Sequence, residues 1–141
     1  MEILYTAHAT ATGGGRNEGH SATDDGKVDV KLSTPKEMGG SGEGANPEQL
    51  FATGYSACFL GALRFVAGKD HKKLPDDTTL TADVGFGKRD DGEGFGLKVT
   101  LTAHVPGFDV ATVKDLMDRA HIVCPYSHAT KGNIEVNLVV G

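Results

Sequence analysis

Apolar side chains are densest between residues 50 and 68, where they fall on nearly every side of a helix. Asn46 is a favourable N-cap, Pro47 suits the first helical position, and Glu48 suits the first turn. The pattern therefore predicts a helix over residues 47–69. A helix that is apolar on most sides is a central helix, covered on more than one face.

A second helix is predicted over residues 109–123 from apolar positions at three- and four-residue spacing. These positions are Val110, Val113, Leu116, Met117 and Ala120. Pro125 should end or kink this helix, because proline cannot donate a backbone hydrogen bond.

The remaining regular segments are predicted to be strands, from apolar–polar alternation in residues 27–33 and 133–140 and from strand-forming residues between turns in the others, of which residues 16–23 are mostly polar. They are residues 2–12, 16–23, 27–33, 78–88, 95–105 and 133–140. Glycine clusters and Asp-Gly pairs separate them as turns. The order is strands, helix, strands, helix, strand, which predicts an α+β fold in one domain over residues 1–141.

Composition and charge exclude several classes of protein. The net charge is −5 and no Lys/Arg stripe occurs, so nucleic acid is not an expected partner. The N-terminus lacks a basic region followed by an apolar run, so a cytoplasmic location is predicted. Arg64 and several hydroxyl residues interrupt the apolar helix, which favours a buried core helix over a membrane span.

The chain has two cysteines, Cys58 and Cys124. A permanent disulfide is not expected in a reducing compartment. The count alone favours two buried, inert thiols, and a transient catalytic pair is the alternative. Burial among apolar groups raises the pKa of a thiol, so a reactive Cys58 requires a nearby cation to hold its thiolate.

The sequence lacks the spacing of several common sites. No phosphate-binding loop, dinucleotide fingerprint or serine-nucleophile elbow occurs. His121, Cys124 and His128 could gather a metal in principle, but a structural zinc site needs four clustered ligands, so no metal is expected.

Three segments nevertheless resemble a known family. Residues 46–59 read NPEQLFATGYSACF, residues 123–133 read VCPYSHATKGN, and a looser match covers Tyr5 to Arg16 with its Gly-Gly-Gly-Arg. These segments resemble the organic hydroperoxide resistance (Ohr) family of the Ohr/OsmC superfamily. Together they span nearly the whole chain. The Cys-Pro-Tyr-Ser segment and the early Gly-Gly-Arg are closer to Ohr than to the OsmC branch.

The resemblance implies a fold, an activity and a set of site residues. It implies antiparallel sheets wrapped around two central helices in an intertwined homodimer. The activity implied is reduction of organic hydroperoxides, including those of fatty acids, to alcohols, with recycling by a lipoylated protein or another dithiol and with no cofactor. The peroxidatic cysteine falls on Cys58 and the resolving cysteine on Cys124, and the family's arginine and glutamate fall on Arg16 and Glu48.

Helical geometry adds a condition. Glu48 and Cys58 are ten residues apart, about 15 Å along a helix, so an arginine held by Glu48 does not easily reach Cys58. Either Arg16 swings between the two, or Arg16 and Glu48 come from the second subunit of a dimer, which is the favoured hypothesis. The apolar side chains expected to bind greasy hydroperoxides are Phe51, Tyr55, Phe59 and Phe95.

Alternatives to a hydroperoxide reductase of the Ohr type remain open from the sequence. They are an OsmC-type peroxidase, a peroxide-responsive redox sensor, and a non-catalytic binding or structural domain with two buried thiols.

Overall fold

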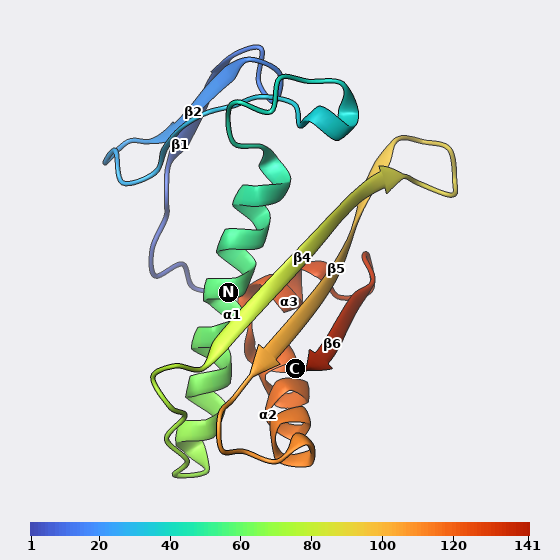
Figure 1. The fold of residues 1–141 in the computed structure, drawn as a ribbon. Helices are drawn as coiled ribbons and strands as arrows, with labels where there is room; N and C mark the ends of the chain where they lie inside the picture. Colours follow the sequence, from blue (N-terminus) through green and yellow to red (C-terminus); the bar gives the residue numbers. More distant parts are fainter. The chain divides into compact units, whose positions relative to one another are not determined.

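The computed structural model describes all residues, 1–141, and divides them into two compact units, Met1–Leu50 and Phe51–Gly141 (Figure 1). Both contain strands, and α1 (Pro47–Lys69) begins in the first unit and continues in the second. The α+β class predicted from the sequence is confirmed. A single domain over residues 1–141 stays a prediction.

The first unit is a three-stranded antiparallel meander followed by a 3₁₀ turn. Its elements are β1 (Ala9–Gly13), β2 (Gly19–Thr23), β3 (Asp29–Lys31) and η1 (Lys36–Met38). Thr12 pairs with His20 across the first hairpin, and Ser21 pairs with Val30 across the second. The predicted strands over residues 16–23 and 27–33 are therefore present but shorter.

The predicted strand over residues 2–12 is wrong for residues 2–8, which form no strand within the chain. No other strand of the chain pairs with them, and a strand needs a neighbour to satisfy its backbone groups. Their large apolar side chains are exposed: Ile3 to 64%, Leu4 to 91% and Tyr5 to 80%.

The start of α1 follows the predicted capping pattern. The backbone N–H of Gln49 donates to Asn46 Oδ1 at 2.9 Å, and the backbone N–H of Asn46 donates to Gln49 Oε1 at 3.0 Å. This reciprocal capping box satisfies two amides that the helix itself leaves unpaired. The predicted helix over residues 47–69 is confirmed.

The second unit contains a three-stranded mixed sheet. Its strands are β4 (Thr79–Lys88), β5 (Phe95–His104) and β6 (Val136–Val140), in the order β4-β5-β6. The β4–β5 hairpin is antiparallel, as expected, but β6 runs parallel to β5, so this sheet is not wholly antiparallel. The two helices between β5 and β6 form a crossover, which returns the chain in the same direction.

Two helices precede β6. α2 (Val110–Val123) confirms the second predicted helix, and its N-cap Asp109 accepts a hydrogen bond from the backbone N–H of Thr112 at 2.9 Å. α3 (Pro125–Thr130) was not expected. Pro125 ends α2 as predicted, and it also begins α3, because its fixed φ suits the first turn of a helix.

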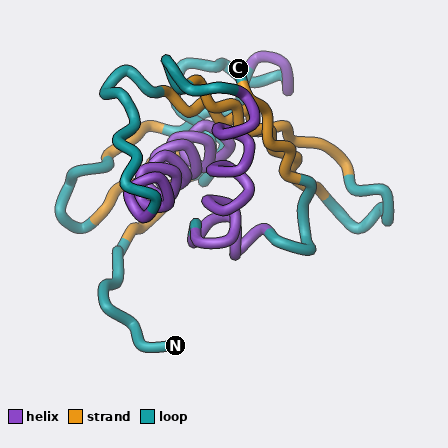
Figure 2. Tube along the Cα trace, turned by 90° about the horizontal axis from the view of Figure 1, so that it is seen from below, coloured by secondary structure: helices purple, strands orange, loops and turns teal.

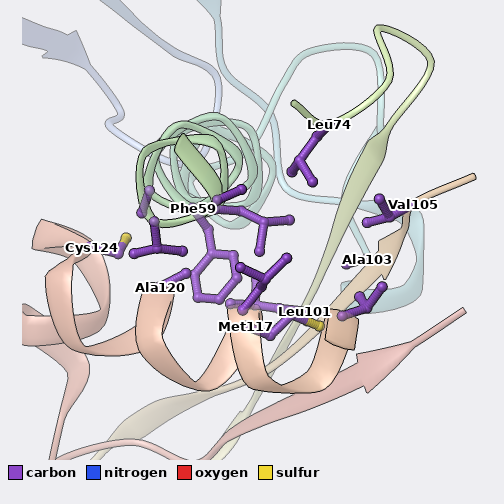
Figure 3. Close-up of a cluster of buried hydrophobic side chains, with 14 of the residues drawn as sticks. Phe59, Leu74, Leu101, Ala103, Val105, Met117, Ala120 and Cys124 are labelled. Atoms are coloured by element: carbon purple, nitrogen blue, oxygen red, sulfur yellow. The ribbon is translucent and has the colours of Figure 1, made fainter. Parts of the chain in front are cut away.

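The core of the second unit lies between the helices and one face of the sheet. Figure 2 shows α1 and α2 running beside the strands, and Figure 3 shows side chains from α1, α2 and β5 meeting between them. On β5, Val99, Leu101 and Ala103 are fully buried, and the residues between them are not. This alternation is that of a sheet covered on one face.

By length and composition alone, α1 could cross a membrane. The core helix of a soluble protein passes the same test, and one face of α1 belongs to the core of the second unit. Its buried side chains are Tyr55, Phe59, Ala62, Leu63, Val66 and Ala67.

Candidate redox site

The two cysteines meet in the second unit although 66 residues separate them. Cys58 lies midway along α1, and Cys124 lies between α2 and α3. Their Sγ atoms are 3.4 Å apart and both thiols are free. A disulfide bond is about 2.05 Å long, so a small movement would join them.

Cys124 owes its place to the break between two helices. It is the C-cap of α2 and the N-cap of α3, with an extended backbone at φ −67° and ψ 124°. Its own N–H donates to the Ala120 carbonyl at 2.9 Å, and its carbonyl accepts from the N–H of His128 at 2.9 Å. Both helix ends are thus anchored, and the buried Cys124 side chain is directed at α1.

Within a single chain, the surroundings of Cys58 disfavour its thiolate form. Burial raises the pKa of the Cys58 thiol above its ordinary value, and the adjacent Cys124 raises it further. A hydrogen bond from the backbone N–H of Tyr126, in the first turn of α3, acts in the opposite direction. Because the thiolate is the nucleophile, this thiol needs a further positive group to react quickly near neutral pH.

Aromatic rings surround the first turn of α3. The Tyr126 ring centroid lies 5.7 Å from that of Tyr55 and 6.0 Å from that of Phe51. Gly54 allows this approach, because a Cβ there would lie 2.8 Å from the Tyr126 hydroxyl. Tyr126 was not singled out from the sequence. The sequence feature that could have indicated it is its position directly after Pro125, which places it in the first turn of a helix beside Cys124.

The four aromatic residues expected to bind substrate lie in different environments. Phe51 is half-buried and packs against the core, whereas Tyr55 and Phe59 are fully buried in it. Phe95 lies at the turn end of the β4–β5 hairpin, stacked on Phe86 at 4.9 Å and 60% exposed. Within the chain, only Phe51 combines partial exposure with packing near the Tyr126 ring.

A chain of polar side chains lies one helical turn from the cysteines. Ser127 Oγ lies 2.9 Å from the Tyr55 hydroxyl and 2.8 Å from His121 Nδ1. Thr130 Oγ1 lies 3.3 Å from the same Tyr55 hydroxyl. His121 is thus hydrogen-bonded to a side chain, and no group of three or more potential metal ligands occurs.

Arg16 and Glu48 form an ion pair in the first unit. Arg16 Nη2 lies 2.7 Å from Glu48 Oε1, and Nη1 lies 3.4 Å from Oε2, a two-pronged arrangement. The turn between β1 and β2 carries Arg16. That turn requires glycine, since a Cβ on Gly14 would lie 1.9 Å from the Asn17 carbonyl and Gly15 has φ +61°.

Comparison with known proteins places these features in a family. The family model described as OsmC-like protein matches residues 40–139. An organic hydroperoxide resistance protein of Xanthomonas axonopodis pv. citri is 53% identical, over 99% of this chain and 96% of the relative. The chain belongs to the Ohr branch of the OsmC-like family.

Solved structures agree with this membership. The crystal structure of an organic hydroperoxide resistance protein from Elizabethkingia anophelis has 51% identity and a TM-score of 0.91, covering 100% of this chain and 99% of that one. OhrB of Bacillus subtilis gives 40% identity and a TM-score of 0.88, covering 99% and 100%. Membership of the Ohr family supports a role in organic hydroperoxide resistance.

Proposed function

We propose that this Ohr-family chain is a thiol-dependent peroxidase that reduces organic hydroperoxides, including those of fatty acids, to alcohols. The observation that carries the proposal is the 3.4 Å separation of the Cys58 and Cys124 sulfur atoms. Two free thiols at this distance can form a disulfide with little rearrangement. Three helices hold them there: Cys58 lies on α1, and Cys124 lies between α2 and α3.

The first step uses Cys58 as the nucleophile. Its thiolate attacks the terminal oxygen of the hydroperoxide, the O–O bond breaks, and the alkoxide leaves as an alcohol after taking a proton. Cys58 becomes a sulfenic acid. The sulfur is thereby oxidised by two electrons and the peroxide is reduced by two.

The second step uses Cys124 as the resolving thiol. Its sulfur attacks the Cys58 sulfenic sulfur, the S–S bond forms, and the hydroxyl leaves as water with the thiol proton. An external dithiol, for which a lipoylated protein is proposed from the family resemblance, then reduces the disulfide by exchange and is itself oxidised to a disulfide. No cofactor is required.

Arg16 is proposed as the cation that activates Cys58. A guanidinium stays charged when partly buried, so it can stabilise a thiolate and orient a peroxide oxygen. Glu48, only 13% exposed at its side chain, would hold Arg16 in one orientation through the 2.7 Å contact.

A homodimer is proposed to complete the site, with Arg16 and Glu48 of one chain serving Cys58 of the other. The single chain leaves much apolar surface uncovered, which supports a partner. Ile3, Leu4 and Tyr5 are exposed in the N-terminal segment, and Phe65 on α1 is 55% exposed. Residues 3–5 are consecutive in the chain, and a cluster of exposed apolar side chains marks an interaction site.

Cys124→Ser should separate the two steps. The variant is expected to consume about one equivalent of cumene hydroperoxide per chain and then to stop, because its sulfenic acid has no resolving partner. Stopped-flow consumption, with dimedone trapping and mass spectrometry of Cys58, measures this. Sustained turnover of the variant with a lipoyl dithiol at the wild-type rate would remove Cys124 from the proposed cycle.

Organic hydroperoxides should react faster than hydrogen peroxide. Burying roughly 100 Å² of apolar substrate surface, for example against Phe51 and the Tyr126 ring, stabilises binding by about 2.5 kcal/mol, equivalent to roughly 50- to 100-fold. Second-order rate constants for cumene hydroperoxide and hydrogen peroxide test this, with tert-butyl hydroperoxide expected between them. Equal constants would contradict an apolar binding surface.

A further inference from the structure

The polar chain beside the cysteines joins all three helices that build the pair. Tyr55 is on α1, His121 on α2, and Ser127 and Thr130 on α3. Tyr55 precedes Cys58 by three residues, His121 precedes Cys124 by three, and Ser127 follows Cys124 by three. Residues three apart share a helix face, so these hydrogen bonds act one turn away from each sulfur atom.

The number of available protons favours one direction of donation along these hydrogen bonds. If His121 Nδ1–H donates to Ser127, then Ser127 donates to Tyr55 and Tyr55 donates to Thr130. The Thr130 hydroxyl in turn donates to the Ser127 carbonyl at 3.1 Å. Each of the four contacts then contains one proton. In the opposite direction the Tyr55–Thr130 contact is left without a proton, because Thr130 already donates to that carbonyl.

We infer that this relay, His121–Ser127–Tyr55–Thr130, positions Cys124 against Cys58 and so sets the rate at which their disulfide forms. The inference rests on the proposed peroxidase function and assigns it positioning residues. The atoms of the relay do not touch the reacting sulfur atoms; they hold the helices that carry them.

The relay sets a condition on the proton of His121. Burial lowers the pKa of His121, Lys131 lowers it further, and Asp118 raises it. The lowered pKa favours the neutral ring, which has a single N–H proton, and the relay requires that proton to be on Nδ1. The Nε2 atom is then the unprotonated one.

The relay matters most when the sulfur atoms approach. The Sγ atoms must move from 3.4 Å to about 2.05 Å while keeping the geometry of a disulfide. Misplacing reacting atoms by about 1 Å can slow a reaction by about 100-fold, so loosening α3 should slow disulfide formation by roughly 10- to 100-fold. Attack of Cys58 on the peroxide involves α3 only through Tyr126, whose backbone N–H bonds to Cys58, and it does not require Cys124 to be positioned, so this step should slow far less.

Ser127→Ala in the full-length chain tests the relay because it removes both hydrogen bonds of the Ser127 hydroxyl, to His121 and to Tyr55. After one equivalent of cumene hydroperoxide, Cys58 should oxidise within about twofold of the wild-type rate, and its sulfenic acid should accumulate because the disulfide forms roughly 10- to 100-fold more slowly. Ser56→Ala is the matched control: this half-buried α1 hydroxyl donates to the Thr53 carbonyl, takes no part in the relay, and its loss should change neither rate. Wild-type disulfide formation in Ser127→Ala would overturn the inference.

Variants of His121 give a readout that a purely structural role would not produce. His121→Leu should slow disulfide formation, and His121→Asn should restore it, because the asparagine amide can place a donor near the position of Nδ1. In the wild-type protein, ¹⁵N NMR should find His121 as the Nδ1–H tautomer. An Nε2–H tautomer, or equal rates for the leucine and asparagine variants, would contradict the relay.

Oxidation by diamide makes the test independent of the proposed function. Diamide also ends in attack of one cysteine on the other, so Ser127→Ala should slow the Cys58–Cys124 disulfide here too. If the wild-type chain fails to react with hydroperoxides but shows this difference with diamide, the peroxidase proposal falls and the relay stands. Equal diamide rates overturn the relay alone.

Discussion

Cys58→Ser is expected to lower turnover of organic hydroperoxides by at least about 1000-fold, to the background rate of the reductant alone. The serine hydroxyl is nearly isosteric with the thiol but is far less acidic and nucleophilic, so no sulfenic acid and no disulfide can form. Coupled assays with cumene hydroperoxide and a lipoyl dithiol measure the loss.

The control for this variant is its fold. Cys58 is only half-buried and its Sγ contacts Cys124, so the circular dichroism of Cys58→Ser should match that of the wild type. Cys124→Ser, which retains Cys58, should still consume its first equivalent of peroxide. Residual turnover by Cys58→Ser above about 1% of wild type would show that another group attacks the peroxide, because removing a covalent nucleophile lowers the rate by more than about 100-fold.

Arg16→Ala is expected to slow the reaction of Cys58 with cumene hydroperoxide by roughly 100-fold at pH 7. Burial and Cys124 raise the pKa of the Cys58 thiol, so without the guanidinium only a small fraction is thiolate. That fraction rises about tenfold per pH unit below the pKa, so the difference between variant and wild type should shrink as pH increases. Stopped-flow rates from pH 6 to pH 10 test this.

Two further variants define what Arg16 does. Arg16→Lys keeps the charge but not the two-pronged contact with Glu48, so its rate should lie between those of wild type and Arg16→Ala. Mixing Arg16→Ala chains with Cys58→Ser chains should restore activity, since one site of each mixed dimer then has both groups. No recovery in mixed dimers would exclude sites shared between subunits.

The helices could be predicted because their signals are local. The capping box of Asn46 and Gln49 and the apolar spacing of α2 depend on residues within a turn or two. The parallel pairing of β6 with β5 depends on a crossover of more than thirty residues, which alternation along a strand does not encode. Residues 2–8 read as a strand by composition but find no partner strand in their own chain.

The sequence predicted which residues form the candidate site, but it did not predict which of them touch. Resemblance indicated the two cysteines, but only the fold brings Cys58 and Cys124 within 3.4 Å. The aromatic residues Tyr55 and Phe59 read equally well as substrate-binding or as core side chains, and they are fully buried. Ser127 belongs to the segment that carries the resemblance, but its hydrogen-bonding role had no sequence signal, because the role of a buried hydroxyl depends on its partners in space.

The most direct test of the account is to treat the fully reduced protein with one equivalent of cumene hydroperoxide and analyse it by intact-mass and peptide mass spectrometry. The account predicts release of cumyl alcohol, loss of two hydrogen atoms per chain, and a peptide in which Cys58 is bonded to Cys124 of the same chain. A protein that stays reduced, or that acquires a disulfide only between chains, would contradict it.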